Sequence, residues 1–250
     1  MQRPLVPLVF AVALGACVAS NGDEGIFVTK NVAPGDGCTF TSDVAEQFLA
    51  HGSLDLYSPT PYKFHPQMQS RITATAGNED QRTILLRGAR IDLELADKAL
   101  FSSTELASFK SSGLTHFQSL FSAPLPPNGG IADASFDLIP AGLTAAIAAK
   151  VGDATMAFRT EVIAKVVVYG DMSGNEVTSQ EFQFPVTVCN DCVVHVLKDA
   201  ATGTPLTCPV VAGTVVAPGN ACNVYQDDPV DCCTMGTSLV CPATVATAAQ

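Results

Sequence analysis

Two cysteines separated by two residues form the pattern with the most obvious chemical potential in this sequence. Cys189-Asn190-Asp191-Cys192 suits a thiol–disulfide redox pair, half of a zinc site, or a structural disulfide. A redox pair of this kind should open a helix, because a helix N-terminus lowers the pKa of the thiol. Residues 193–197 instead have the composition of a strand. The pattern therefore favours a structural disulfide.

A zinc site needs further ligands at suitable spacing, and the chain offers few. Cys232 and Cys233 are adjacent rather than spaced, which does not match a second pair of zinc ligands. His195 follows the first pair closely and is the alternative ligand, although a lone histidine beside a strand is more often a surface residue. Metal ligation and redox chemistry remain the less favoured alternatives.

Three carboxylates lie within five residues at Asp227, Asp228 and Asp231. Calcium binds several oxygen ligands, so such a cluster could contribute to a loop site. The cluster lacks the spacing and the glycine of an EF-hand loop, and Pro229 stiffens it. A solvated acidic turn is therefore the preferred interpretation.

Motifs of known hydrolases are absent from the sequence. It contains neither a G-x-S-x-G nucleophile elbow nor an H-E-x-x-H zinc motif. The four histidines are widely scattered, at His51, His65, His116 and His195. The chain has no Trp and only 4 Tyr, which disfavours an aromatic platform for sugars. We therefore expect no enzyme, no catalytic residue, no metal and no cofactor.

The first residues have the layout of an export signal. Arg3 precedes an apolar run over residues 5–14, which is too short to span a bilayer. The run ends in Leu14-Gly15-Ala16-Cys17, which resembles the lipobox of bacterial lipoproteins. The resemblance implies cleavage before Cys17, lipidation of Cys17, and, because Val18 is not Asp, transfer to the outer membrane. The alternative is an ordinary signal peptide cleaved near Ala19-Ser20.

The cysteine count supports an exported protein. The sequence has 9 cysteines, and setting Cys17 aside leaves an even number for disulfides. These eight are Cys38, Cys189, Cys192, Cys208, Cys222, Cys232, Cys233 and Cys241. We expect Cys38 to connect the N-terminal segment either to the cysteine-rich end or to the base of the main domain. The pairing itself does not follow from sequence, since eight cysteines allow about 105 arrangements.

The charge excludes one class of partner. The net charge is −11, and removal of a leader containing Arg3 makes it −12. A chain this acidic is unsuited to nucleic acid or to electrostatic docking on anionic lipid. The expected contacts are therefore a membrane reached through a lipid anchor and another envelope protein.

Hydrophobic alternation predicts an all-β chain, namely an antiparallel β-sandwich, immunoglobulin-like in outline, with a small disulfide-rich C-terminal module. The clearest period of two runs over residues 89–95, and residues 160–188 predict a long hairpin around a turn at 170–175. Helices are expected at 140–152 and 103–110, and most of 111–132 is expected to be loop.

These patterns divide the chain into five parts. They are a signal peptide at 1–16, a lipidated segment and linker at 17–44, the β-sandwich at 45–188, the cysteine-rich module at 189–242, and a flexible tail at 243–250. The module has too few large apolar residues to fold without its bridges.

Two short segments of the module add a further resemblance. Gly219-Asn220-Ala221-Cys222 and the run from Gln226 to Cys233, together with the lipobox, resemble cysteine-rich lipoproteins of soil-dwelling Gram-negative bacteria. This resemblance implies an envelope location and no particular activity. The sequence therefore predicts a lipid-anchored cell-envelope protein with a non-catalytic binding or structural role. The alternative is a secreted hydrolase or metal-dependent binding protein that uses His195 or the acidic turn.

Overall fold

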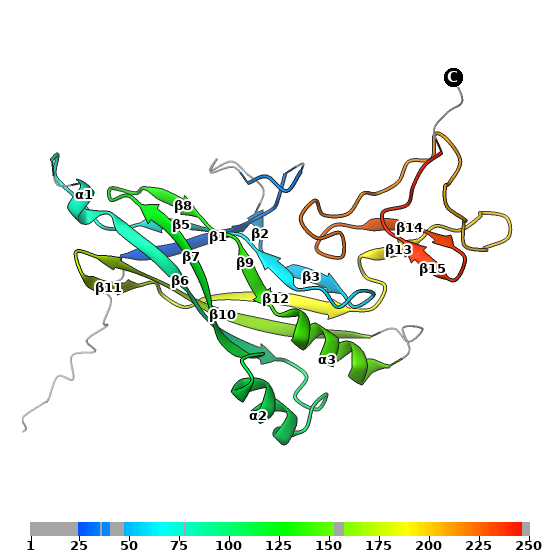
Figure 1. Cartoon of the computed structure of the whole chain (residues 1–250), viewed down its shortest axis with the longest axis horizontal. Helices are drawn as coiled ribbons and strands as arrows, with labels where there is room; N and C mark the ends of the chain where they lie inside the picture. The colour runs from blue at the N-terminus through cyan, green and yellow to red at the C-terminus, as the bar shows by residue number, and fades with distance from the viewer. Residues whose placement is uncertain (1–24, 36, 41–47, 78, 153–157, 247–250) are drawn as a thin grey trace, which may run out of the picture.

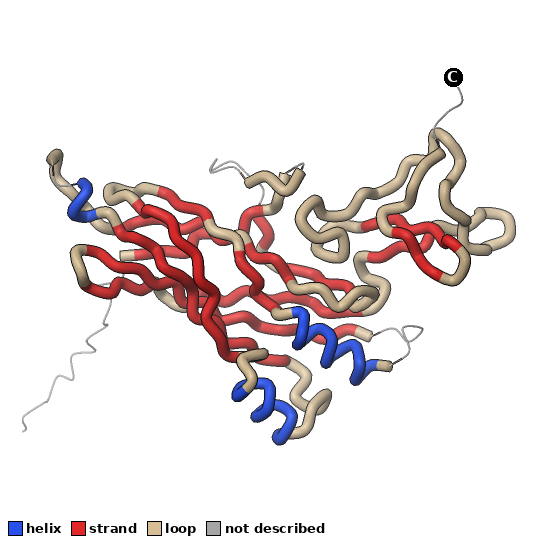
Figure 2. Tube along the Cα trace, viewed as in Figure 1, coloured by secondary structure: helices blue, strands red, loops and turns tan. Residues whose placement is uncertain are grey.

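The structure, a computed structural model, describes residues 25–35, 37–40, 48–77, 79–152 and 158–246 (Figure 1). It is mostly β, with 47% strand and 12% helix, which confirms the predicted class. Figure 2 shows that strands make up most of one large body, whereas the C-terminal part consists largely of loops. No helix among the described residues is long and apolar enough to cross a membrane. Cys17 and residues 247–250 lie outside the described residues.

The largest sheet curls into an open half-barrel with strand order β3-β12-β10-β6-β7, and β11 pairs with one end of β10. Its strands are β3 (Gly52–Asp55), β6 (Ile84–Leu95), β7 (His116–Leu125), β10 (Arg159–Met172), β11 (Asn175–Thr178) and β12 (Phe182–Cys189). All neighbours are antiparallel except β3, which runs parallel to β12. The sheet is therefore mixed, and the wholly antiparallel prediction is corrected at β3. No hairpin joins these two strands, so no short turn fixes their relative direction.

The alternation of residues 89–95 continues through β6 with one change of parity. Before Arg87 the inward-facing residues have even numbers, and after Gly88 they have odd numbers. The change occurs because the register to both neighbouring strands shifts at this point. A Cβ atom on Gly88 would lie 2.4 Å from a backbone oxygen of the adjacent strand, and one on Gly170 would lie 2.5 Å from another. Glycine at both positions thus allows the close backbone approach at this bulge.

The predicted hairpin over residues 160–188 is confirmed in its pairing. β10 turns at Ser173-Gly174, where both residues have positive φ angles of 50° and 83°. The returning chain is divided into two strands, β11 and β12, and both pair antiparallel with β10. The turn residues at 170–175 therefore do reverse the chain, as their composition predicts.

A second sheet closes the core from the other side. It has the order β2-β1-β5-β8 and consists of β1 (Ile26–Val32), β2 (Phe48–Leu49), β5 (Pro66–Ser70) and β8 (Ile131–Asp133). A two-stranded sheet pairs β4 (Tyr62–Phe64) with β9 (Phe136–Ile139). The predicted linker at 17–44 therefore contains a strand of the main domain. The reason is that the apolar side chains of β1 join the common core, with Ile26 fully buried.

Both predicted helices are present, together with one short additional helix. They are α1 (Glu79–Arg82), α2 (Ser103–Ser111) and α3 (Ala141–Val151). α2 begins at a capping box in which Ser102 and Glu105 bond each other's backbone N–H groups. α3 follows Pro140, ends at Gly152 with a φ of 74°, and buries Leu143 and Ile147 on one face.

The segment 111–132, expected to be mostly loop, instead contains β7 and β8. Every second residue of β7 is only half-buried, and Leu120 on the opposite face is 78% exposed. β7 has this weak contrast because it lies at the edge of the half-barrel. Its inward positions also include Ser119 and Ala123, whereas Leu120 faces outward, so the sequence shows little hydrophobic alternation.

The C-terminal module contains a small sheet of β13 (Val194–Val196), β14 (Val230–Met235) and β15 (Ser238–Val240). The flexible tail predicted at 243–250 is corrected for its first four residues, and residues 247–250 lie outside the described ranges. Ala243 donates a backbone hydrogen bond to Asp231 at 2.6 Å, and Ala246 donates one to Val210 at 2.8 Å. Residues 243–246 therefore belong to the module, because they pair with its 210 segment.

Candidate functional site

Four disulfides join the eight cysteines that follow Cys17. The pairs are Cys38–Cys222, Cys189–Cys192, Cys208–Cys233 and Cys232–Cys241. Adjacent Cys232 and Cys233 lie on one strand, so their side chains point to opposite sides and reach different partners. Of the two connections expected for Cys38, the structure has the one to the cysteine-rich module. Several disulfides of this kind indicate an exported protein.

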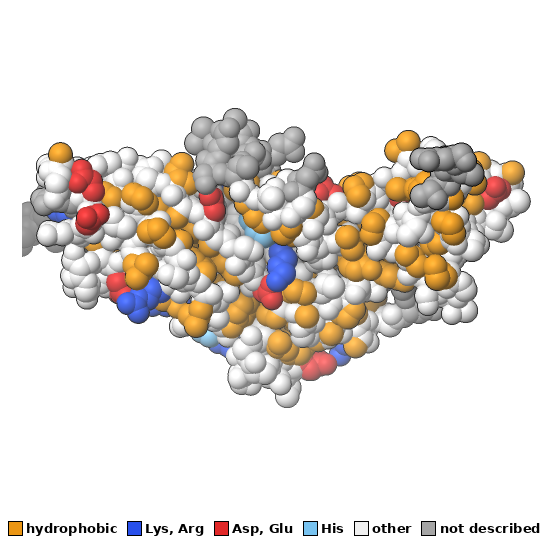
Figure 3. All heavy atoms as spheres, turned by 45° about the horizontal axis from the view of Figure 1, so that its top comes forward, with side chains coloured by type: hydrophobic (Ala, Val, Ile, Leu, Met, Phe, Trp, Pro, Cys, Tyr) orange, Lys and Arg blue, Asp and Glu red, His pale blue; other side chains and the backbone are white. Residues whose placement is uncertain are grey.

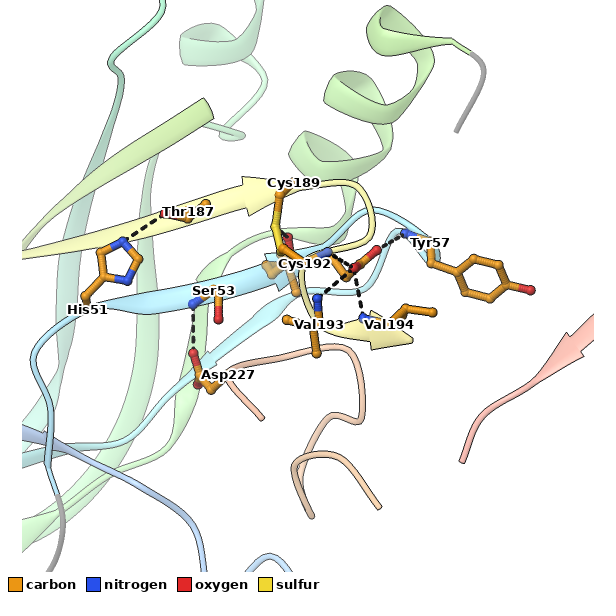
Figure 4. Close-up of a disulfide and its surroundings, with 11 residues drawn as sticks. His51, Ser53, Tyr57, Thr187, Cys189, Cys192, Val193, Val194 and Asp227 are labelled. Atoms are coloured by element: carbon orange, nitrogen blue, oxygen red, sulfur yellow. Dashed lines mark hydrogen bonds between the residues drawn. A yellow bond between two sulfur atoms is a disulfide. The ribbon is translucent and has the colours of Figure 1, made fainter. Parts of the chain in front are cut away.

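The Cys189–Cys192 loop lies where the half-barrel meets the module (Figure 4). The buried carboxylate of Asp55 holds it there. Asp55 Oδ2 accepts hydrogen bonds from the backbone N–H groups of Cys192, Val193 and Val194 at 3.0, 3.0 and 3.1 Å. Oδ1 accepts a further bond from Tyr57 N–H at 2.9 Å. These amide groups bind Asp55 rather than a sulfur atom, so they do not favour a reactive thiolate. The arrangement suits a structural clamp.

A turn of the module extends the half-barrel at its β3 edge. Asp55 N–H donates to the Tyr225 carbonyl at 2.9 Å, and Asp227 N–H donates to the Ser53 carbonyl at 2.9 Å. The Gln226 side chain bonds both backbone groups of Lys63, at 2.7 and 2.8 Å, much as a neighbouring strand would. The module is therefore joined to the main domain by hydrogen bonds as well as by the chain and a disulfide.

Asp227 belongs to this junction and not to a solvated acidic turn. Its carboxylate accepts hydrogen bonds from Ser53 N–H at 2.8 Å and from Tyr62 Oη at 3.0 Å. Burial raises the pKa of Asp227 to about 6, although the bonds from Ser53, Gln226 and Tyr62 act in the opposite direction. The same burial and the Asp227 charge raise the pKa of Tyr62.

The remaining residues considered for metal binding do not gather into a group of three ligands in the described part of the chain. Asp231 Oδ2 accepts a hydrogen bond from Ala217 N–H at 2.7 Å, and Asp228 is exposed. His195 is exposed on β13 opposite Asp231 in the register of the small sheet. Within the described ranges, no group of three or more His, Cys, Asp or Glu side chains could hold a metal ion.

The four histidines are also separated in space. His51 bonds Thr187 Oγ1 at 2.9 Å beside the C-x-x-C loop, and His116 bonds Asp92 at 2.5 Å on the outer face of the half-barrel. His65 is 4% exposed and lies in the wall of a pocket on the other side of the core. The structure therefore gathers no catalytic triad from these four residues.

His65 differs from the other three histidines in being buried against an aromatic ring. Phe40 stacks on its imidazole ring, with 3.6 Å between ring centroids. Burial, together with the positive charge of Lys63, lowers the pKa of His65 to about 4. The ring is thus neutral at physiological pH. No sequence pattern could have indicated the burial, because Phe40 and the rest of the pocket wall come from other segments of the chain.

His65 and Asp227 give the stability of the protein opposite pH dependences. Below pH 6.5 the unfolded chain protonates His65 while the folded protein does not, so this residue lowers stability as the pH falls toward 4. Between pH 6 and 3.8 the folded protein binds a proton at Asp227 while the unfolded chain does not. This residue therefore raises stability as the pH falls across that range. We expect the two effects to oppose each other between pH 6 and 4.5.

Single substitutions should separate the two effects. The Asp227→Asn variant should lose stability more steeply than the parent as the pH falls from 6.5 to 4.5. The His65→Phe variant should lose stability less steeply than the parent over the same range. Each difference in slope should be less than about 1.4 kcal/mol per pH unit. Urea unfolding followed by circular dichroism at several pH values measures both slopes. Parallel pH profiles for the parent and the two variants would contradict these assignments.

Three large hydrophobic side chains of the module are mostly exposed. Val211, Val215 and Met235 are 78%, 91% and 58% exposed. Figure 3 shows hydrophobic side chains over the module and the adjoining half-barrel, with few charged side chains between them on this face. Such a surface is compatible with contacts to another protein.

The sequence matches no protein-family model, and no curated protein matches it. The class that the fold and the bridges define is an exported, disulfide-stabilised, mostly β protein.

Proposed function

We propose that this chain is an exported protein held at the cell envelope by a lipid on Cys17, and that its folded part has a non-catalytic binding or structural role. The observation that supports the anchor is the pairing of the cysteines. The four bridges use eight of the nine cysteines and leave Cys17 over. An odd cysteine in an exported protein needs a separate use, and lipidation supplies one. The outer membrane and an immunoglobulin-like outline of the sheets remain part of this proposal.

The position of Gly25 in the fold supports a display role for the module. Gly25 lies against Val177 of β11, at the end of the half-barrel far from the module (Figure 1). Gly25 is eight residue steps from Cys17 along the chain, so the tether spans at most about 28 Å. β10 alone has 14 residues and extends roughly 45 Å. If the long strands stand perpendicular to the bilayer with the Gly25 end nearest the membrane, the module and its exposed Val215 face away from the bilayer, where a partner can reach them.

The anchor predicts a clear effect of Cys17→Ser. We expect the parent to incorporate labelled fatty acid and to sediment with membranes, whereas Cys17→Ser loses both properties and keeps all four disulfides. A Ser20→Ala variant, three residues away, is the matched control and should behave as the parent. Labelling with fatty acid, fractionation and mapping of disulfides by mass spectrometry test these points. A parent protein without lipid would reject the anchor.

The binding role is tested in the same cells. Crosslinking of the anchored protein in intact cells should return the same partner in replicate experiments. Absence of a reproducible partner would reject the binding role while leaving the anchor standing, so the two parts of the proposal fail separately.

A further inference from the structure

A small pocket lies between the end of β1, the loop that carries Phe40, and the connection from β8 to β9. Its volume is about 220 Å³, and its walls are Val32, Phe40, His65, Asp133, Ala134 and Ser135. Three of these side chains are apolar and three are polar. A concavity that combines apolar walls with a small number of polar groups is the usual form of a small-molecule site.

The imidazole of His65 is an unsatisfied group in this wall. Both ring nitrogens are buried, and neither has a hydrogen-bond partner in the described part of the chain. The backbone, in contrast, is fully engaged, since His65 N–H donates to Asn31 Oδ1 at 2.9 Å and its carbonyl accepts from Val32 N–H at 3.0 Å. A buried polar group left unpaired costs about 1–3 kcal/mol, so such groups normally have a partner.

The chemistry of the missing partner follows from the ring and its surroundings. A neutral imidazole has one N–H donor and one nitrogen acceptor, and a hydroxyl group can satisfy either. The carboxylate of Asp133 in the wall opposes an anion, and the Lys63 charge that acts on His65 opposes a cation there. The partner is therefore expected to be neutral.

The size of the pocket limits the rest of the molecule. A cavity of about 150 Å³ is enough for benzene in a protein interior. The pocket here is somewhat larger, at about 220 Å³, and Val32, Phe40 and Ala134 provide apolar contact. Both ring nitrogens are buried, so a neighbouring side chain of the wall has to shift for a ligand to reach them.

We propose that this pocket binds a small neutral molecule of the phenol class, with its ring against Val32, Phe40 and Ala134 and its hydroxyl group hydrogen-bonded to the imidazole of His65. This site is independent of the lipid anchor and of the surface of the module. The competing account is that ordered water alone occupies the pocket.

Titration of the oxidised full-length protein with phenol and with toluene tests the site. Phenol should shift the backbone NMR signals of Val32 and Ala134 in a saturable way. Toluene has the same ring without the hydroxyl group and should bind about three- to tenfold more weakly, the ratio expected for one hydrogen bond. Absence of saturable shifts with either compound would overturn the proposal in favour of water, and equal affinities would overturn the role of His65.

Two variants and one control complete the test. His65→Phe should reduce phenol binding to the level of toluene, and Ala134→Leu should fill the pocket and abolish binding of both compounds. His195→Phe makes the same substitution at an exposed histidine of the module and should leave both affinities unchanged. If His65→Phe fails to fold, the comparison of phenol with toluene on the parent and the Ala134→Leu result still decide. Unchanged phenol binding in Ala134→Leu would place the ligand elsewhere and overturn the proposal.

Discussion

Replacement of Asp55 by alanine is expected to lower the free energy of unfolding by about 3–5 kcal/mol. The carboxylate is 1% exposed and accepts four backbone hydrogen bonds, from Tyr57 and from three consecutive residues beginning at Cys192. Alanine removes every acceptor and leaves these donors unpaired, two of them on Val193 and Val194, which are each 2% exposed. The cost of such unpaired donors adds up across the group.

Urea unfolding of the oxidised protein, followed by circular dichroism, measures this effect. Asp55→Asn keeps the shape and one acceptor oxygen but not the charge, so its loss should be intermediate. Asp80→Ala in the exposed α1 is the matched control and should change stability by less than about 0.5 kcal/mol. A loss below about 1 kcal/mol for Asp55→Ala would show that water replaces the carboxylate and that the clamp contributes little.

The role of Asp55 also shows what the sequence could not reveal. Three of its four donors lie 137 to 139 residues away along the chain. Nothing about an isolated aspartate in a strand predicts which amide groups it will meet. The same holds for Gln226, whose side chain pairs with Lys63 across 163 residues. Hydrogen bonds between such distant residues depend on the complete fold, so local sequence patterns do not predict them.

Elements with strong local signals were predictable. The alternation in 89–95 identified the second half of β6, because a half-buried strand must place every second residue in the core. Turn residues around Gly174 identified the hairpin, and Pro140 and Gly152 marked the ends of α3. β7 was missed since its inner residues are only half-buried. The parity change in β6 was missed because a bulge depends on both neighbouring strands.

Some of the candidate site residues could likewise be recognised from the sequence, whereas others could be recognised only from the fold. The even count of cysteines after Cys17 indicated disulfides, and three of the four bridges join cysteines within residues 189–241. The acidic turn was misjudged at Asp227, because its burial depends on Tyr62 and Ser53 of the other domain. His65 was one of four scattered histidines, and only the fold shows that Phe40 and Asp133 come to lie beside it.

Removal of the Cys38–Cys222 bridge should be the most destabilising disulfide change. Its cysteines are 184 residues apart, whereas the other three bridges join cysteines separated by 3, 25 and 9 residues. Only the long bridge restricts most of the unfolded chain. The chain-entropy relation gives a loss of about 5 kcal/mol for a loop of this length. The double variant Cys38→Ser, Cys222→Ser avoids an unpaired thiol.

The native structure should survive this change, so the loss should arise in the unfolded chain. Cys38 is exposed, which limits lost packing, and the hydrogen bonds of Gln226 and Asp227 still join the module to β3 and β4. Circular dichroism of the folded variant should therefore match the parent, while the urea midpoint falls. The double variant Cys232→Ser, Cys241→Ser is the comparison for loop length, with about 2.5 kcal/mol expected from chain entropy. Its cysteine at 232 is fully buried, so lost packing adds to that value. If the long bridge cost less than about 2 kcal/mol, the unfolded chain would have to remain compact without it, and the chain-entropy account would fail for this protein.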